Sequence, residues 1–496
     1  MTPPEDGALV ALLIDRSAIA VPLCVDLDGT LVCTDTLWEG LVLLLRTRPW
    51  VLLLALVWVF RGRAHFKRRV SESVAIDVQS LPYHQPLLVG LRAAREAGRT
   101  LVLATAADIQ VARRVASHVG LFDEVCASER GQNLKADHKA VHLVARFGAR
   151  GFDYVGDSRA DLSVFPSARR GILVSTTRGI ARAARLQGNV EVVSYRPNVL
   201  RAVLKQMRLH QWAKNVLVVV PAVLAPIPTL DHLLHGVVAA LAFSLCASAG
   251  YVFNDLLDLE ADRVHGSKRR RPLASGALPV AWGPPLFVAL LVASCVLSLT
   301  LLNMGFTVML GIYFVATLTY SFYLKRFTLL DVLVLAWLYT HRILSGSLAT
   351  SVPTSAWLLA FSMFLFLSLA FVKRYVELSA LPDDKVIKHR DYKRADIPMV
   401  ASMGTASGYI AVLVFALYVD QGARSTIYAQ PILLWFSVPV LLYWVSRVWI
   451  IAGRGRLQDD PVKFALRDGV SIACGALVVA IAWLARHPPS WLHFAQ

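Results

Sequence analysis

The hydrophobic pattern of the chain changes near residue 200. From about residue 213 onward, long apolar segments recur, each of roughly the length that a helix needs to cross a bilayer. They lie near residues 214–230, 233–256, 281–302, 304–324, 328–349, 355–376, 399–419, 427–450 and 466–485. The first contains Pro221, Pro226 and Pro228, so we expect it to be kinked or broken. The pattern predicts an all-α membrane domain of nine transmembrane helices over residues 213–490.

Residues 1–195 are less apolar and contain short apolar runs that are typical of buried strands. One of these runs, at residues 21–25, is followed by an aspartate, and another, at residues 101–105, ends in a threonine. Residues 196–212 are predicted to form a linker or an amphipathic entry into the membrane domain.

Two apolar segments interrupt the N-terminal domain, at Leu37–Leu45 and Trp50–Phe60, and a basic run follows them. Each segment is too short to span a bilayer. The pair could be the packed core of a helical cap over about residues 35–95. It could also be an interfacial hairpin whose basic run lies against anionic headgroups.

Composition agrees with two domains. The 496 residues are 56% hydrophobic, with a mean hydropathy of +0.53, which is too apolar for a soluble enzyme. The net charge of +17 comes mainly from short basic clusters between apolar segments, so we expect no nucleic-acid partner. Six scattered cysteines form no C-x-x-C pair, which excludes a cysteine zinc site and a disulfide framework. The start of the chain lacks the pattern of a secretory signal, so a cytoplasmic N-terminal domain is expected.

Positive charge marks every second loop of the membrane half. Lysines and arginines precede the first apolar segment and follow the second, fourth, sixth and eighth, whereas the intervening loops are nearly neutral. The positive-inside rule then places the N-terminal domain in the cytoplasm and the C-terminus outside. A reporter fused after Gln496 is expected to be active only outside the membrane; a cytosolic signal would contradict this topology.

An acidic cluster ends the second apolar segment. Asn254, Asp255, Asp258 and Asp262 are spaced by one, three and four residues, which puts them on one face of a helix. So many carboxylates at a membrane boundary repel one another unless cations neutralise them. Mg²⁺ takes one or two carboxylates and completes its shell with water and phosphate oxygens. We therefore predict a Mg²⁺–diphosphate site with the three aspartates as metal ligands and Asn254 as a substrate-orienting residue; a solvated acidic helix end is the alternative.

Charged and polar residues also concentrate in the other predicted cytosolic loops, and one arginine lies inside a predicted span. Cations close to a metal–diphosphate site can hold the remaining phosphate oxygens, and an ionisable group inside the bilayer is a functional candidate. The predicted substrate-binding residues are Lys268, Arg271, Lys325, Arg342, Lys373, Arg374, Tyr375 and Arg390. The alternatives are that the basic loops only determine topology and that Arg342 pairs with an acid on a neighbouring helix.

The acidic cluster, the apolar spans and the charged loops resemble the UbiA superfamily of intramembrane prenyltransferases. Four further stretches resemble its decaprenyl-phosphate phosphoribosyltransferase branch: Leu209-His-Gln-Trp-Ala-Lys-Asn-Val, Lys268-Arg-Arg-Arg-Pro-Leu-Ala-Ser-Gly, Lys373-Arg-Tyr-Val-Glu-Leu and Asp460-Pro-Val-Lys-Phe-Ala-Leu-Arg-Asp. The resemblance covers about residues 200–490. Members that prenylate aromatic rings usually carry a second D-x-x-x-D motif, whereas here Asp331 is followed four residues later by Leu335.

This resemblance implies Mg²⁺-dependent transfer of 5-phosphoribose from phosphoribosyl diphosphate to a polyprenyl phosphate, with Asp255 and Asp258 central to catalysis. It also implies a multi-pass protein of a bacterial inner membrane. The competing interpretations are a transferase that uses a prenyl diphosphate donor and an aromatic or other acceptor, and a membrane scaffold without activity.

The N-terminal domain carries an ordered set of motifs that resembles haloacid dehalogenase-type phosphatases, beginning with Asp26-Leu-Asp28-Gly-Thr. The resemblance implies a Rossmann-like α/β domain with a parallel sheet and a helical cap. The resemblance implies that Asp26 is the nucleophile and that Asp28 protonates the leaving alkoxide and later activates water. Thr105, at the end of a strand, would hold a phosphate oxygen.

The later motifs of this set supply a lysine and two acids. Lys139 is preferred over Lys135 because it opens a helical stretch that leads into the next strand. Asp157 and Asp161 would complete a Mg²⁺ site with Asp26. An active phosphatase could remove the 5-phosphate from the product of the transferase.

Overall fold

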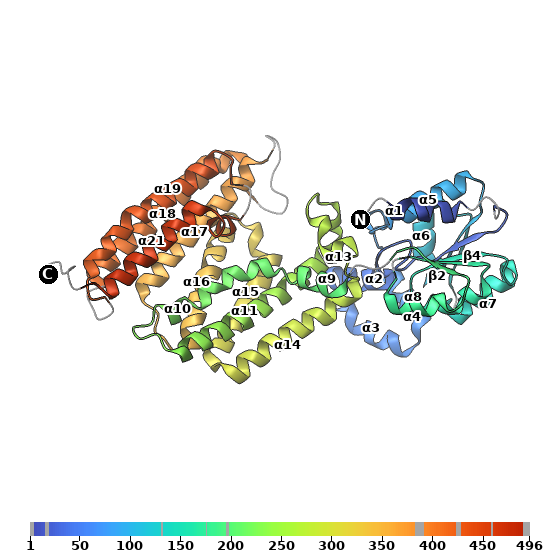
Figure 1. Ribbon diagram of the computed structural model, residues 1–496, viewed down its shortest axis with the longest axis horizontal. Coiled ribbons are helices and arrows are strands. Elements are labelled where there is room, and N and C mark those ends of the chain that lie inside the picture. Colours follow the sequence, from blue (N-terminus) through green and yellow to red (C-terminus); the bar gives the residue numbers. More distant parts are fainter. Residues whose placement is uncertain are drawn as a thin grey trace. The chain divides into compact units, whose positions relative to one another are not determined.

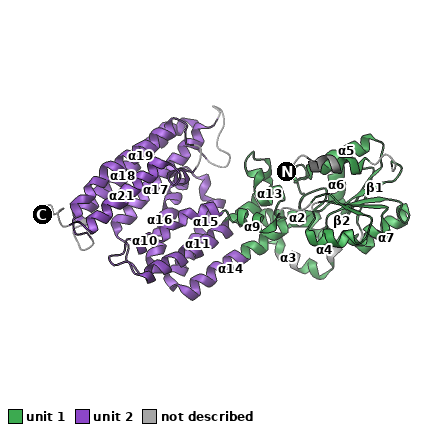
Figure 2. Ribbon diagram, in the orientation of Figure 1, with its two compact units in different colours: residues 1–208, 251–288 green, residues 209–250, 289–496 purple. Residues whose placement is uncertain are grey.

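A computed structural model describes residues 4–14, 19–129, 132–174, 176–194, 198–381, 391–422, 428–457 and 460–489. The chain divides into two compact units (Figure 2). Unit 1 comprises residues 1–208 and 251–288, and unit 2 comprises residues 209–250 and 289–496. Unit 1 is therefore built from two separate stretches of the chain.

Unit 1 contains a six-stranded parallel sheet with the strand order β3-β2-β1-β4-β5-β6 (Figure 1). The strands are β1 (Leu23–Val25), β2 (Leu101–Asp108), β3 (Glu124–Ser128), β4 (Asp153–Gly156), β5 (Arg170–Leu173) and β6 (Val190–Val192). The surrounding helices are α1 (Pro4–Leu13), α5 (Gln85–Glu96), α6 (Ile109–Val119), α7 (Asp137–Phe147) and α8 (Arg178–Arg185). The order reverses at β1, and such a switch point opens a crevice at the carboxyl ends of the strands.

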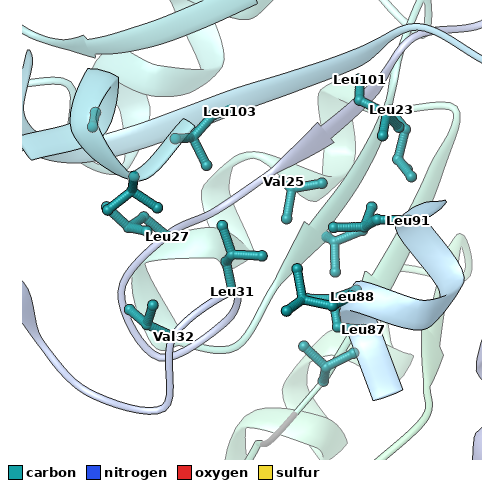
Figure 3. Packing of buried hydrophobic residues seen from close by; sticks show 14 of the residues in the cluster. Leu23, Val25, Leu27, Leu31, Val32, Leu87, Leu88, Leu91, Leu101 and Leu103 are labelled. Atoms are coloured by element: carbon teal, nitrogen blue, oxygen red, sulfur yellow. The ribbon is translucent and has the colours of Figure 1, made fainter. Parts of the chain in front are cut away.

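The sheet is held by a core of aliphatic side chains. Leu23 and Val25 of β1 pack with Leu101 and Leu103 of β2 and with residues of α5, such as Leu91 (Figure 3). These five side chains are fully buried. Near-continuous burial along short strands is typical of a parallel sheet covered on both faces, which confirms the predicted α/β fold.

The segment between β1 and β2 forms helices, so the predicted helical cap is confirmed. It comprises α2 (Thr36–Thr47), α3 (Val51–Phe60), α4 (Arg63–Ser73) and a 3₁₀ turn at Val78–Ser80. The Asp35 side chain caps α2 by accepting from the amides of Leu37 and Trp38. Leu44 of α2 packs with Val70 and Val74 around α4. Most of the described side chains of α3 are exposed.

The described part of the membrane half has eight long helices rather than the predicted nine, because the first predicted span is broken, as its prolines led us to expect. Eight helices in the described residues are long and apolar enough to cross a membrane. They are α11 (Leu230–Leu257), α14 (Gly283–Leu301, extended by a 3₁₀ turn from Val280), α15 (Met304–Phe322), α16 (Leu330–Thr350), α17 (Ala356–Ser379), α18 (Ile397–Leu417), α19 (Ser437–Gly453) and α21 (Gly469–Arg486). The chain is a multi-pass integral membrane protein.

The first predicted span is not a regular helix. Its sequence forms a 3₁₀ helix at Leu209–Val218 and the four-residue α10 (Val220–Val223), because prolines at positions 221, 226 and 228 interrupt the α-helical hydrogen bonds. The 3₁₀ segment runs antiparallel to α11: Trp212 donates to Ser248 at 2.9 Å, whereas Val219 lies against Gly236. A broken segment thus follows α11 back along its length, and the predicted orientation of the termini stays a prediction.

Short elements complete the chain between the spans. In unit 1, α9 (Val199–Gln206) precedes the membrane half, and α12 (Leu259–Val264), a 3₁₀ turn at Lys268–Arg270 and α13 (Pro272–Ser275) connect α11 to α14. In unit 2, α20 (Pro461–Ala465) precedes α21. Unit 2 has its own core, formed mainly by α16, α17, α18 and α19.

Candidate functional sites

The carboxyl end of β1 positions the predicted nucleophile. Asp26 directly follows β1 and is buried, and its Oδ1 accepts from the amide of Leu27 at 2.9 Å. Gly29 adopts a φ of +79°, which lets the chain turn sharply after Asp28. The neighbouring strand β2 places the buried Thr105 in the same crevice, where its Oγ1 accepts from the amide of Ala107 at 3.0 Å.

The structure places Lys139 beside Asp26. The Lys139 Nζ lies 3.0 Å from Asp26 Oδ1 and 3.6 Å from Asp161 Oδ1, and it donates to the Tyr154 hydroxyl at 2.7 Å. These carboxylates raise the pKa of Lys139 despite its burial, so the lysine remains charged. Lys135 lines a cavity that also contains Asp28. Lys139 is the lysine with a described contact to Asp26, and the choice between the two lysines stays a prediction.

Asp26, Asp157 and Asp161 form a buried carboxylate group whose oxygens lie within 4.8 Å of one another. Thr30 Oγ1 donates to Asp157 at 3.2 Å, and Tyr154 and Ser158 both donate to Asp161 at 2.7 Å. Oxygen ligands this close together suit a hard divalent cation. These residues could therefore hold a divalent metal next to the nucleophile.

Asp28 lies at the opening of this crevice, where its Oδ1 accepts from the amide of Thr36 at 2.8 Å. Burial, and then the nearby charge of Asp35, raise the pKa of Asp28 to about 8. A carboxyl that stays protonated at neutral pH can donate a proton to a leaving alkoxide. A cavity of about 410 Å³ begins at Asp28 and extends between α2, α3, α4 and the start of α6.

The raised pKa of Asp26 leads to a prediction about metal binding. Burial, opposed by the Lys139 ammonium, raises the pKa of Asp26 to about 6. Because a carboxylate must lose its proton to bind a metal, Mg²⁺ affinity at this site is expected to fall by about tenfold per pH unit below pH 6 and to level off above it. Calorimetric titration of the full chain from pH 5 to pH 7.5 measures this dependence. The Asp26→Asn variant should lose this pH-dependent component, and a wild-type affinity that is flat over the range would contradict the prediction.

The acidic cluster, which is part of unit 1, is held by arginines. Asp255, near the end of α11, pairs with Arg208 and accepts from Gln206 Nε2 at 2.8 Å. Arg271 Nη1 lies 3.0 Å from Asp255 and 2.5 Å from Asp262 on α12. Two buried carboxylates from different helices thus converge on a single cationic group.

The chemistry of the cluster can be compared with what a metal ion needs. Its candidate ligand atoms are carboxylate oxygens on helices, and the Arg271 guanidinium already lies between Asp255 and Asp262. Lys268 Nζ approaches Asp262 at 4.0 Å, whereas no described lysine or arginine lies within ion-pair distance of Asp258. These oxygen donors are of the kind that a divalent cation binds. The described carboxylates of the cluster are not gathered into a metal-sized group as those around Asp26 are, so the Mg²⁺ site at Asp255, Asp258 and Asp262 stays a prediction.

The cap of the α/β domain contacts α12, immediately beside this cluster. Arg263, which follows Asp262, donates to both oxygens of the buried Glu39 on α2, at 2.6 and 3.1 Å. Gly276, with a φ of +75°, packs so closely that an added Cβ would lie 2.4 Å from the carbonyl oxygen of Cys33. The two stretches that form unit 1 are therefore joined by a buried ion pair and by close backbone packing.

In unit 2, Asp331 and Arg374 form a buried pair. Asp331 begins α16, Arg374 lies near the end of α17, and their side chains approach to 2.6 Å with no exposed surface. The Tyr392 hydroxyl donates to Asp331 at 2.8 Å, and Arg374 also pairs with Glu377. Arg374 was predicted to bind substrate. In the structure its guanidinium neutralises Asp331.

Removing the acid of this pair should cost stability. Asp331→Ala leaves the guanidinium of Arg374 buried without its main partner, so we expect the free energy of unfolding to fall by about 3–5 kcal/mol. Denaturant unfolding in detergent measures this change. Asp391→Ala, which removes an exposed carboxyl nearby, serves as the control, and the double change Asp331→Leu with Arg374→Met should recover much of the loss. An Asp331→Ala protein with the wild-type free energy of unfolding would contradict this account.

A second polar group of unit 2 surrounds Asp460. Lys214 Nζ lies 2.7 Å from Asp460 Oδ2, and Lys373 Nζ lies 3.9 Å from the same oxygen. The Lys214 ammonium is also 5.7 Å from the ring centre of Tyr339. The loop before α20 and the ends of the 3₁₀ segment and α17 thus bring two lysines together around one carboxylate.

The other predicted substrate-binding residues of unit 2 do not join this group through their described contacts. Arg342 is buried in α16, where it donates to Asn215 at 2.9 Å and Tyr313 at 3.2 Å, so its described partners are neutral rather than acidic. Tyr375 packs edge-on against a tryptophan ring. Lys325 lies in the 3₁₀ turn before α16, and Arg390 is outside the described residues.

Sequence analysis missed several residues that the structure adds to these sites. Arg208 and Gln206 hold Asp255, and Lys214 holds Asp460. Lys214 and Asp460 both lie in stretches that carried the family resemblance, so a signal was available for them. Arg208 offered none, because a single arginine in a basic stretch looks like a topology determinant.

Comparisons with known proteins cover both halves of the chain. A family model described as the UbiA prenyltransferase family matches residues 215–467. An uncharacterized protein of Sinorhizobium fredii is 38% identical over 93% of this chain and 90% of its own length. A decaprenyl-phosphate phosphoribosyltransferase of Mycobacterium tuberculosis is 29% identical over 60% of this chain and 96% of its own length. The structure of a UbiA homolog from Archaeoglobus fulgidus bound to GPP and Mg²⁺ covers 58% of this chain and 99% of that chain, at 17% identity and a TM-score of 0.44.

Proposed function

Because the chain belongs to the UbiA prenyltransferase family, we propose that its membrane half is a polyprenyl-phosphate phosphoribosyltransferase. The reaction would move 5-phosphoribose from phosphoribosyl diphosphate to a polyprenyl phosphate of the decaprenyl type. The name of the mycobacterial relative, which this chain matches over 96% of that protein's length, supports this choice of substrates.

The observation that carries the proposal is the state of Asp331. A transferase that prenylates aromatic rings would use a second acidic motif at this place, and Asp331 is the acid that the sequence offers there. Its carboxylate pairs with the buried Arg374 and accepts a hydrogen bond from Tyr392, and Leu335 stands where the second acid of such a motif would be. The lack of a second complete acidic motif in the sequence supports a phosphoribosyl donor over an aromatic-prenylating reaction.

The chemistry needs little proton transfer. A phosphate oxygen of the lipid forms a bond to C1 of the ribose, the bond from C1 to the diphosphate breaks, and the diphosphate leaves with the electron pair. Mg²⁺ bound at Asp255, Asp258 and Asp262 would stabilise the charge that builds up on the leaving diphosphate. Arg271 and Lys268, which contact these carboxylates, can turn to the phosphate oxygens when the metal neutralises the acids.

The choice of donor tests this proposal. The purified chain in nanodiscs is given polyprenyl phosphate with phosphoribosyl diphosphate labelled in its β-phosphate, and in parallel an aromatic acceptor with a prenyl diphosphate labelled in the same way. Labelled diphosphate is expected only from the phosphoribosyl donor. Release only from the prenyl diphosphate would overturn the proposal in favour of a prenyltransferase.

We further propose that the N-terminal domain is a phosphatase that removes the 5-phosphate from this lipid-linked product. Asp26 would attack the phosphorus, Asp28 would protonate the departing 5-hydroxyl, and water would then hydrolyse the aspartyl phosphate. Lys139, 3.0 Å from Asp26, and the buried Thr105 would hold the phosphate oxygens. Mg²⁺ would be held by Asp26, Asp157 and Asp161, whose oxygens already converge.

A further inference from the structure

We infer that α3 of the cap anchors the phosphatase domain in the headgroup region of the bilayer, so that the cavity beside it receives a phosphate ester whose lipid tail stays in the membrane. The inference rests on the proposed phosphatase function and names the class of its substrate. It commits to the lipid surface as the partner of α3.

Four of the described side chains of α3 are apolar and exposed, whereas Val51, Leu52 and Trp58 pack against the cluster around Leu44. The exposed fractions are 52% for Leu54, 51% for Val57, 54% for Val59 and 91% for Phe60, and Trp50 just before the helix is 66% exposed. A helix of a soluble domain normally turns polar residues to the solvent, whereas the ten residues of α3 are Val-Leu-Leu-Leu-Ala-Leu-Val-Trp-Val-Phe. A continuous apolar surface of this kind needs a covering partner.

Length and charge favour a bilayer surface as this partner. Ten helical residues extend about 15 Å, which is half of what a span needs, so α3 can lie in the interface but cannot cross it. Exposed arginines stand at both ends of the helix: Arg46 and Arg48 before it, and Arg61 after it. An apolar helix flanked by cations is typical of segments that bind the boundary between acyl chains and anionic headgroups.

Unit 1 also brings α3 close to a membrane boundary. Arg46, at the end of α2, donates to Glu260 on α12 at 3.2 Å, and α12 directly follows the spanning helix α11. The chain from Arg46 to the start of α3 at Val51 can extend at most about 17 Å. The start of α3 therefore lies within this distance of the Arg46 backbone, and Arg46 contacts a residue three positions beyond the end of α11.

The cavity beside α3 has the lining that an amphiphilic ester would need. Val59 of α3 and Phe66, Val70 and Val74 around α4 supply apolar lining, and Asp28 lines the same cavity. Lys67 of α4 also lines the cavity, and its Nζ donates to the carbonyl oxygen of Ala106 at 2.7 Å. A sugar phosphate can thus reach Asp28 while the lipid portion passes along this apolar lining, which includes Val59 of α3.

The first experiment compares two substrates of the full chain in nanodiscs that contain phosphatidylglycerol. One is ribose 5-phosphate, which is soluble, and the other is the 5-phosphorylated lipid in the bilayer. Val57→Glu with Phe60→Glu introduces charges on α3 at positions outside the cavity lining. We expect hydrolysis of the lipid ester to fall about tenfold or more while that of ribose 5-phosphate is unchanged.

A matched control separates this effect from general surface changes. Val141 and Leu186 are 68% and 86% exposed and lie in or just after helices of the same domain, away from the cap. Val141→Glu with Leu186→Glu should leave the hydrolysis of both esters unchanged. Equal losses on both esters in the α3 variant, or no loss on the lipid ester, would overturn the inference.

A second measurement tests the anchor without any activity. Phe60 is replaced by a fluorescent amino acid in the full chain, in nanodiscs with lipids brominated on their acyl chains. Quenching at position 60 well above that at position 186 is expected. Equal quenching at the two positions would overturn the proposed membrane anchor. A change in the oligomeric mass of the α3 variant would overturn it as well, because a second copy of the chain would then cover α3. A wild-type chain that hydrolyses neither ester would instead overturn the proposed phosphatase, while the quenching result stands on its own.

Discussion

Asp26→Asn is expected to lower phosphate release from the 5-phosphorylated lipid by roughly 10³-fold or more while leaving the transferase step intact. The neutral amide cannot form the aspartyl phosphate. The side chain keeps nearly the same volume, and it still lies beside Lys139 at the end of β1. Given polyprenyl phosphate and phosphoribosyl diphosphate, the variant should accumulate the phosphorylated lipid, which mass spectrometry of the extracted lipids distinguishes from its dephosphorylated form.

The control for this variant is Asp77→Asn. Asp77 is exposed and caps a 3₁₀ turn of the cap region by accepting from the amide of Gln79, and asparagine caps helices about as well as aspartate. Asp77→Asn should give the wild-type product. If Asp26→Asn and the wild type gave the same lipid product, the two halves of the chain would not act in sequence.

Asp258→Asn should lower the release of diphosphate from the phosphoribosyl donor by about 10²–10³-fold. Asp255 and Asp262 already share Arg271, so Asp258 is the carboxylate of the cluster without a described ion pair, and its charge is available to a metal. Its loss removes one anionic ligand from the site that binds the leaving group. The thermal stability of Asp258→Asn should change little, because Asp258 has no described ion-pair partner that would lose its counter-charge.

Glu260→Gln is the matched control, since Glu260 lies on α12 and pairs only at the surface with Arg46. It should keep the wild-type rate, because exposed ion pairs contribute little. Diphosphate release and thermal unfolding are measured side by side for both variants. If Asp258→Asn released diphosphate at the wild-type rate, or if Glu260→Gln lost as much activity as Asp258→Asn, the acidic cluster would have no specific role in the transfer reaction.

The motifs around Asp26 and Thr105, through the family that they resemble, were sufficient to predict the parallel sheet. Asp26 directly follows β1, whereas Thr105 lies inside β2, which continues to Asp108. Long apolar segments predicted the spans, with one error. Proline can break a segment whose mean hydropathy is still that of a span, so hydropathy alone overcounts at Pro221.

Site residues were less predictable because their partners are distant in the sequence. The spacing of Asp255, Asp258 and Asp262 predicted one shared helix face, and this was wrong, because α11 ends at Leu257 and Asp262 lies on α12. Nothing local indicated that Arg271 would lie between Asp255 and Asp262. The role of Arg374 was also open, since a basic residue at the end of a span can bind substrate, set topology or neutralise an acid. Only tertiary packing placed its guanidinium against Asp331.

Because unit 1 is formed by residues 1–208 together with residues 251–288, the gene cannot be divided between these two stretches without breaking their contacts. A fragment that ended within the linker at residues 196–212 would keep Glu39 but lose Arg263, and the loop at Cys33 would lose the tight packing of Gly276. A fragment that began there would carry the opposite defect. Expression trials, domain swaps and complementation with separate halves should therefore retain residues 251–288 together with the N-terminal domain, and the two proposed activities are best studied as one polypeptide.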